Sequence, residues 1–197
     1  MVENLHAITG SMFSGKTDEV IRQANREMYA GKKLQAFYPA IDNRREKGVI
    51  QSHSGAKLDA EEVSAALDIL KMVEKDTKVV VIDEVQFFDS NIVGVSETLL
   101  ENDIKVILGG LPTDFRGMPF GSMPELLARS DKISRLTAIC THETDGIPCG
   151  KEATRTQRFV DGEPAKYTDP VVVIGAEEQY SPRCRDHHKV PGKPKSI

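Results

Sequence analysis

The chain has 197 residues, of which 39% are hydrophobic and 28% charged, and its net charge is −4 at neutral pH. This length fits one medium domain or one domain with a small appendage, and no apolar run is long enough to span a bilayer or to form a signal peptide. We therefore expect a cytoplasmic protein without membrane partners, and the negative charge argues against a broad nucleic-acid surface.

The pattern of apolar residues predicts strands that alternate with helices. Strands are expected at 5–9, 34–38, 49–53, 79–84, 104–110 and 133–139. Helices are expected at 17–30, 63–73, 90–101 and 122–130. Asp59-Ala60-Glu61-Glu62 has the pattern of a capping box for the second helix, and the polar residues 42–48 predict a surface loop. The alternation indicates the α/β class, with a doubly wound parallel sheet.

The character of the sequence changes after Ile139, where we place a domain boundary. We expect an α/β nucleotide-binding domain at 1–139 and a small zinc-binding domain at 140–190. Residues 191–197 are rich in Pro and Lys, which predicts a disordered tail.

The stretch from Gly10 to Thr17 matches the phosphate-loop (P-loop) pattern of glycine, four residues and then Gly-Lys-Ser/Thr. A predicted strand precedes it and a predicted helix follows, so backbone N–H groups and the helix N-terminus would face an anion. Lys16 would reach the β- and γ-phosphates of a nucleotide, and the Thr17 hydroxyl would bind Mg²⁺. The residues of this expected site are Gly10, Ser11, Met12, Phe13, Ser14, Gly15, Lys16 and Thr17.

Two carboxylates end the apolar strand at 79–84. Asp83 has the place of the Mg²⁺-side carboxylate of P-loop enzymes. Glu84, expected on the opposite side of the strand, is the candidate base for the acceptor's proton. An Asp-Glu pair also occurs as a helix cap or a solvated turn. By itself the pair does not separate a kinase from an ATPase, because a base activates water as easily as a hydroxyl.

The three cysteines of the chain, together with one histidine, predict a metal site. Cys140, Cys149, Cys184 and His187 form a ligand set that suits tetrahedral Zn²⁺. Eight residues separate the first two cysteines, which is wide for a zinc knuckle. Two alternatives stay open: three unrelated buried thiols, and His188 in place of His187 as the fourth ligand.

Several stretches together resemble the zinc-containing thymidine kinases, the type that includes the human cytosolic and the bacterial enzymes. They lie in the family's order, cover nearly the whole chain and occupy residues 10–17, 82–88, 114–121, 135–140 and 173–180. The resemblance implies ATP-dependent phosphorylation of the 5′-hydroxyl of thymidine, and of deoxyuridine.

The resemblance also implies roles for individual residues. Glu84 matches the family's catalytic base, Lys16 its phosphate-binding lysine, and Arg44 an arginine that acts near the phosphates. Residues matching the nucleotide and Mg²⁺ positions outside the P-loop are Asp83, Glu84, Val85 and Gln86. Residues matching the nucleoside pocket are Met12, Phe87, Leu111, Phe115, Thr156, Val171, Val173, Gly175 and Tyr180.

The zinc-tied segment of this family is a lasso that closes over thymidine, and family members are homotetramers inhibited by thymidine triphosphate. The chain departs from the family pattern in the eight residues between Cys140 and Cys149, where two are usual. Pro112 replaces an aspartate, and Arg155 replaces an aromatic or small residue beside the base. Two other classes are weighed against the kinase: a zinc-bearing ATPase that drives a nucleic-acid partner, and a non-catalytic nucleotide-binding regulator.

Overall fold

A computed structural model describes residues 4–41, 47–172 and 179–194. Its centre is a six-stranded sheet in the order β5-β2-β6-β7-β1-β8, with all neighbouring strands parallel. The strands are β1 (Leu5–Gly10), β2 (Leu34–Pro39), β5 (Glu61–Val63), β6 (Val79–Ile82), β7 (Lys105–Gly110) and β8 (Lys132–Leu136). The parallel sheet confirms the predicted α/β class.

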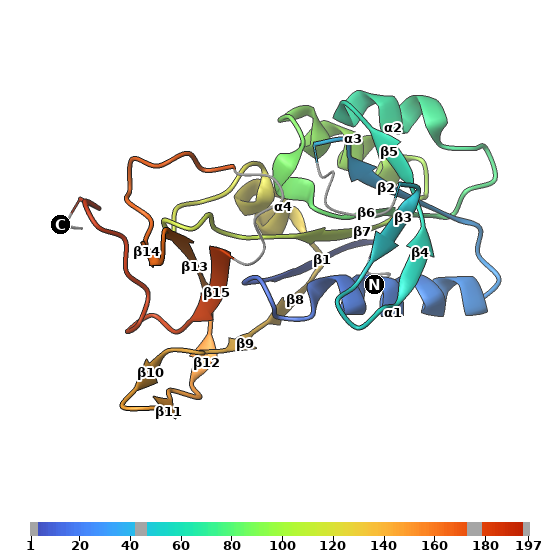
Figure 1. Ribbon diagram of the computed structural model, residues 1–197. Helices are drawn as coiled ribbons and strands as arrows, with labels where there is room; N and C mark the ends of the chain where they lie inside the picture. Colours follow the sequence, from blue (N-terminus) through green and yellow to red (C-terminus); the bar gives the residue numbers. More distant parts are fainter. Residues whose placement is uncertain (1–3, 42–46, 173–178, 195–197) are drawn as a thin grey trace.

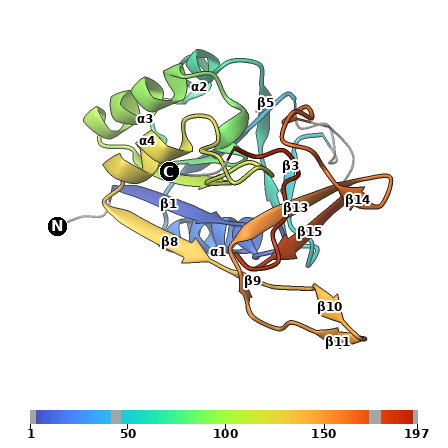
Figure 2. The ribbon, with the colours of Figure 1, turned by 90° about the vertical axis from the view of Figure 1, so that its left-hand side faces the viewer.

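Helices cover both faces of this sheet (Figures 1 and 2). They are α1 (Lys16–Tyr29), α2 (Ala66–Met72), α3 (Asn91–Glu101) and α4 (Met123–Arg129). On one face Val79 and Val81 pack in a cluster with α1, and on the other Val80 and Ile82 pack in a cluster with α2, α3 and α4. Both sets of β6 side chains are therefore buried, as expected for a central parallel strand. No helix within the described residues is both long and apolar enough to cross a membrane.

The remaining strands are short and pair outside the main sheet. The first hairpin is β3 (Val49–Gln51) with β4 (Lys57–Asp59), and β9 (Ala138–Ile139) pairs with β12 (Glu152–Ala153). A second hairpin is β10 (Glu143–Thr144) with β11 (Ile147–Pro148), and β13 (Arg155–Val160) pairs with β14 (Glu163–Pro164) and β15 (Tyr180–Arg183). The strand predicted at 133–139 is therefore divided, because β8 ends at Leu136 and β9 pairs with β12.

The division of the chain into 1–139, 140–190 and 191–197 stays a prediction. Residues 191–194 contact the rest of the chain, since the Tyr167 amide donates to Pro191 O at 2.9 Å and Lys193 Nζ donates to Arg116 O at 2.6 Å. The prediction of a disordered tail did not anticipate these contacts.

The predicted capping box at Asp59-Ala60-Glu61-Glu62 is wrong. Glu61–Val63 forms edge strand β5 beside β2, and α2 begins only at Ala66. The carboxylate of Asp89 instead accepts hydrogen bonds from the amides of Ala66 (3.0 Å) and Asn91 (2.9 Å). The Asp89 side chain thus accepts hydrogen bonds from backbone amides at the starts of both α2 and α3. The residues that carry the local capping pattern pair with β2 instead.

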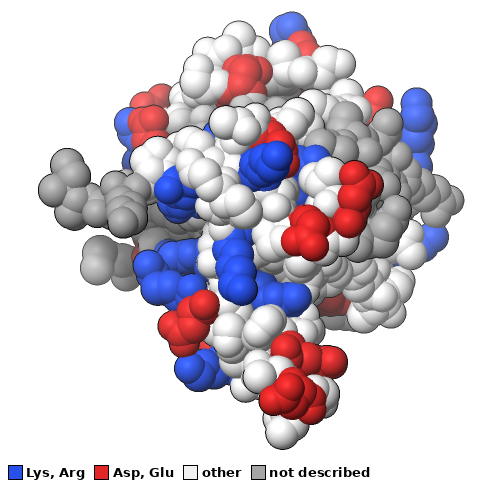
Figure 3. Space-filling view, turned by 60° about the vertical axis from the view of Figure 1, so that its left-hand side comes forward, with Lys and Arg blue, Asp and Glu red and all other residues white. Residues whose placement is uncertain are grey.

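Charged side chains group by sign on one face of the molecule. Figure 3 shows Lys and Arg side chains gathering across the middle of the face that carries the C-terminal strands, with acidic side chains around them.

We predict that Asp89→Ala lowers the free energy of unfolding by about 1 kcal/mol, because two helix N-termini lose their acceptor. The Ala66 amide holds the pKa of Asp89 below its ordinary value, and the Asn91 amide adds to this effect. A lowered pKa in the folded chain means that the stabilisation is present at neutral pH and disappears as the pH falls through that pKa. Urea unfolding of both proteins at several pH values measures this.

The control is Asp76→Ala, which removes only the exposed ion pair with Lys33. Its effect on the unfolding midpoint at neutral pH should be clearly smaller. An Asp89 variant that unfolds like the Asp76 variant would contradict the shared cap.

Candidate functional site

The P-loop lies between the end of β1 and the first residue of α1. Gly15 takes a left-handed conformation (φ 80°), so the turn delivers the chain directly into the helix N-terminus. A Cβ at Gly10 would overlap Leu136 O and Ser14 Oγ, so the close approach of β8 requires glycine there. The Ser14 hydroxyl oxygen is buried and has no hydrogen-bond partner among the described residues. A buried hydroxyl facing a glycine turn at a helix N-terminus fits a bound phosphate.

Lys16 lies over this loop, with Nζ donating to Ser11 O at 2.9 Å. Thr17 Oγ1 lies 3.4 Å from Asp83 Oδ2. These two oxygens belong to the hard ligand class that Mg²⁺ takes, and they lie close enough together to face the same ion. The structure therefore brings together the residues that the sequence assigned to phosphate and Mg²⁺.

Asp83 is also positioned by the glycine at the end of the neighbouring strand. A Cβ at Gly109 would overlap Asp83 Oδ1 and would lie 2.8 Å from Val20 Cγ2. This glycine was not among the predicted site residues. The available signal was a glycine pair at the C-terminal end of a buried strand, where ligands bind in open α/β sheets.

Glu84 does not lie on the strand, contrary to our prediction that it occupies the opposite side. Strand β6 ends at Ile82, and Glu84 has a left-handed backbone (φ 52°) just before the short 3₁₀ helix Val85–Phe87. Non-glycine residues in this conformation are uncommon and occur often at functional sites. The turn leaves both carboxylates buried, Asp83 being 2% exposed and Glu84 9% exposed.

Gln86 connects Glu84 to the next loop. Its Nε2 donates to Glu84 Oε2 at 2.5 Å, and its Oε1 accepts from the Leu111 amide at 3.0 Å. A Cβ at Gly110 would lie 2.8 Å from Gln86 Oε1. The sequence placed Gln86 among the nucleotide-binding residues, and that role stays a prediction. In the structure its side chain connects the Glu84 carboxylate to the Leu111 amide.

The residues expected around a nucleoside come from several segments. Thr156 Oγ1 accepts from the Met12 amide at 3.0 Å, so β13 lies directly against the P-loop. Phe115 is buried beneath the guanidinium of Arg158, whose Cζ lies 5.4 Å from the ring centroid. Leu111 is also buried.

Of the other residues expected at the nucleoside and the phosphates, some have described contacts and some lie outside the described residues. Phe87 packs edge-on against Phe120, and Tyr180 of β15 pairs with Arg158 of β13. Val171 is half-buried at the end of a described segment. Arg44, Val173 and Gly175 lie outside the described residues.

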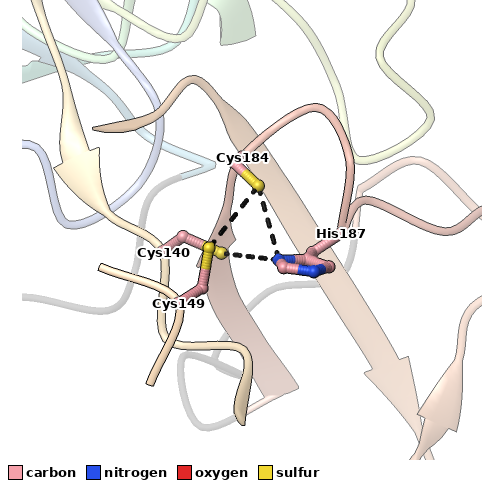
Figure 4. Close-up of side chains that lie close together, drawn as sticks. All are labelled: Cys140, Cys149, Cys184 and His187. Carbon is pink, nitrogen blue, oxygen red and sulfur yellow. Dashed lines mark hydrogen bonds between the residues drawn. The ribbon is translucent and has the colours of Figure 1, made fainter. Parts of the chain in front are cut away.

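The four predicted zinc ligands converge (Figure 4). The ligand atoms of Cys140, Cys149, Cys184 and His187 all lie within 4.8 Å of one another. His187 Nδ1 is 3.5 Å from Cys184 Sγ and 3.7 Å from Cys140 Sγ, and the sulfurs of Cys149 and Cys184 are 4.0 Å apart. Tetrahedral Zn²⁺ with sulfur ligands at about 2.3 Å requires ligand separations of about 3.8 Å. The cluster therefore has the geometry and the donor set for zinc.

The electrostatics of the cluster favour a thiolate at Cys140. Burial would raise the pKa of this thiol, but backbone donors from Cys184 and His142 and the His187 ring bring the pKa down to about 6. A thiolate is the form that binds metal.

His188, the alternative fourth ligand, points elsewhere. Its Nε2 donates to Phe115 O at 2.7 Å, which leaves His187 as the histidine of the cluster.

The eight residues between Cys140 and Cys149 form the β10–β11 hairpin. The Cys149 amide donates to His142 O at 2.7 Å, and the Cys140 amide donates to Lys151 O at 2.8 Å. The hairpin thus closes on itself and returns Cys149 to the cluster.

We predict that His187→Ala abolishes or strongly weakens zinc binding, whereas His188→Ala leaves one zinc per chain. The reason is that only His187 directs a ring nitrogen at the three sulfurs. Zinc content of the purified variants, measured by atomic absorption, checks this. Full zinc content in His187→Ala together with zinc loss in His188→Ala would assign the fourth ligand to His188.

Comparison with known proteins places this geometry in a family. The family model described as thymidine kinase matches residues 3–188. Among solved structures, the large terminase from a thermophilic bacteriophage is similar at 12% identity with a TM-score of 0.46, over 69% of this chain and 41% of the terminase chain. The chain thus spans about two fifths of the terminase's length.

Proposed function

Because this chain belongs to the thymidine kinase family, we propose that it transfers the γ-phosphoryl group of ATP to the 5′-hydroxyl of thymidine, and of deoxyuridine. The observation that carries the proposal is the position of Glu84. It is a buried carboxylate next to Asp83 and is fixed by Gln86 to the loop that leads to Phe115. A base there adjoins Asp83, which contacts Thr17 of the P-loop, and it is largely screened from bulk water.

The donor side needs positioning and charge neutralisation, because phosphoryl transfer requires little covalent chemistry from the protein. The P-loop amides and Lys16 would bind the ATP polyphosphate. Mg²⁺, when bound at Thr17 and Asp83, supplies further neutralisation of the charge on the transferred group. Arg44 would act near the same phosphates.

On the acceptor side, Glu84 would take the proton of the 5′-hydroxyl as the oxygen attacks phosphorus. Thr156 and Met12 connect this side to the P-loop, so donor and acceptor would be placed relative to each other by one hydrogen bond. Phe115 and Phe87 would pack against the nucleoside and exclude water, which limits transfer of the phosphoryl group to water.

Zinc would have a structural role. The four ligands come from the two ends of the C-terminal region, 140–149 and 184–187. A cross-link there supports a segment with a small core of its own, consisting of Ala138, Ala153 and the cysteines. The lasso function, the homotetramer, inhibition by thymidine triphosphate and a cytoplasmic location are further parts of this proposal.

The main competing function is a zinc-bearing ATPase. Incubation with ATP, Mg²⁺ and each nucleoside in turn separates the two. We expect thymidine monophosphate to form in step with ADP. ATP hydrolysis that is independent of nucleoside, with no monophosphate formed, would overturn the kinase proposal.

We predict that Glu84→Gln lowers kcat by about 10²- to 10⁴-fold, because the amide cannot accept the hydroxyl proton. ATP affinity should change little, since the P-loop is intact. Steady-state kinetics and nucleotide titration measure the two effects. Glu97→Gln on the surface of α3 is the control and should keep full activity, and an unchanged kcat in Glu84→Gln would exclude Glu84 as the base.

We also predict that Gly109→Ala reduces kcat by at least tenfold, because the new methyl group displaces the Asp83 carboxylate. Gly94→Ala is a matched control, since a Cβ at Gly94 meets no atom within 4 Å. The activity of both variants over a range of Mg²⁺ concentrations checks the cause. A Gly109 variant with wild-type activity at low Mg²⁺ would show that the position of Asp83 does not matter.

A further inference from the structure

A groove of about 550 Å³ lies beside β13, and none of its lining residues belongs to the P-loop or to the cysteine–histidine cluster. Its lining residues are Gly117, Met118, Arg155, Arg185, His188, Val190 and Lys193. We call it the cationic groove. Successive side chains of a strand point to opposite faces, so Arg155 faces away from its neighbour Thr156 and from the P-loop.

Three cations converge on the cationic groove. Within the described residues, no carboxylate forms an ion pair with Arg155, Arg185 or Lys193. The acid that follows Arg185 in sequence, Asp186, is bonded to Lys151 at 2.9 Å. The C-terminal strands, β13 among them, lie on the side of the molecule where Figure 3 shows Lys and Arg side chains gathering.

The cations are close enough for the positive charge of one to destabilise the charged form of another. Burial lowers the pKa of the Arg155 guanidinium, and the charges of Arg185 and Arg135 lower it further. Repulsion of this kind destabilises the fold unless a counter-charge is bound. An anion bound in the cationic groove would therefore reduce the electrostatic repulsion between these cations.

The absence of a side chain at Gly117 leaves space between these cations, and hydrogen bonds fix the residues that border it. Gly117 has φ 72°, and a Cβ there would lie 3.5 Å from Lys193 Nζ and 3.7 Å from Arg155 Nε. A side chain at this position would thus occupy the room between the two cations. His188 is fixed to Phe115 O, and Lys193 Nζ is fixed to Arg116 O. The cationic groove is consequently bounded by groups with defined positions.

We propose that the cationic groove binds a small molecule through its pyrophosphate group, separately from the P-loop. Arginine donates paired hydrogen bonds that match phosphate oxygens, and two arginines with one lysine balance the charge of a di- or triphosphate. The volume lies within the range of small-ligand sites. The net charge of −4 and the limited size of the groove favour a small molecule over an extended nucleic-acid strand.

Isothermal titration with inorganic pyrophosphate tests this proposal. The zinc-loaded Lys16→Ala chain is used so that P-loop binding is weakened. We expect one pyrophosphate to bind per chain. Adding Arg155→Gln and Arg185→Gln should weaken this binding by at least tenfold, while adding Arg26→Gln, an exposed arginine on α1, should change it less than twofold.

Zinc content and thermal unfolding of each variant are measured in parallel, because Arg185 follows a zinc ligand. If the double variant loses zinc, Lys193→Gln replaces it and should weaken binding by about threefold or more. No binding to the Lys16→Ala chain would overturn the proposal. Equal weakening by Arg26→Gln would overturn it too, because it would indicate a general charge effect.

Further titrations identify the source of the pyrophosphate group. ADP binding that is tighter than pyrophosphate, and sensitive to Arg155→Gln, assigns a nucleotide. Equal binding assigns the pyrophosphate group alone. A single-stranded oligonucleotide that binds more tightly than either would overturn the assignment to a small molecule. These are binding measurements, so they are independent of whether the chain phosphorylates thymidine.

Discussion

Two hydrogen bonds hold the P-loop against the C-terminal strands and so join the two halves of the candidate site. Thr156 Oγ1 accepts from the Met12 amide, and Ser11 Oγ donates to Ala153 O. The P-loop follows β1 of the main sheet, whereas Ala153 and Thr156 belong to the paired strands of the C-terminal region. The P-loop and these C-terminal strands are far apart in sequence, and the two hydrogen bonds bring them together in one candidate site.

The zinc cluster and these two bonds depend on each other. Ala153 packs with Cys140 and Cys184 in the small core of the C-terminal region. Movement of the cluster would therefore be transmitted to β12 and to the Ser11 contact. Under the proposed function, zinc bound at the cluster would influence phosphoryl transfer without touching a phosphate, by fixing strands that lie against the P-loop.

Much of the architecture could be predicted from local signals. The β-branched run Val79–Ile82 specified a doubly buried strand, and the P-loop pattern specified the turn from strand to helix. Predictions failed where tertiary contacts override local preference. Glu61 and Glu62 carry a capping signal, but they pair with β2, and the distant Asp89 accepts the hydrogen bond from the Ala66 amide at the start of α2. The left-handed turn at Glu84 and the contacts of Gln86 also depend on neighbouring loops. The spacing of apolar residues in the sequence carries no information about such contacts. The groove around Gly117 joins residues 117, 155, 185 and 193, and only folding brings them together.

The β10–β11 hairpin separates two metal ligands in sequence without separating them in space. Its tip contains Asp145 and Gly146, both with positive φ, and the adjacent Ile147 is 70% exposed. Because the backbone is already closed by the bond from Cys149 to His142 O, the tip can vary in length at low entropic cost. The hairpin tip is therefore a position where an epitope or a fluorescent reporter could be inserted beside the cysteine–histidine cluster at little cost in stability.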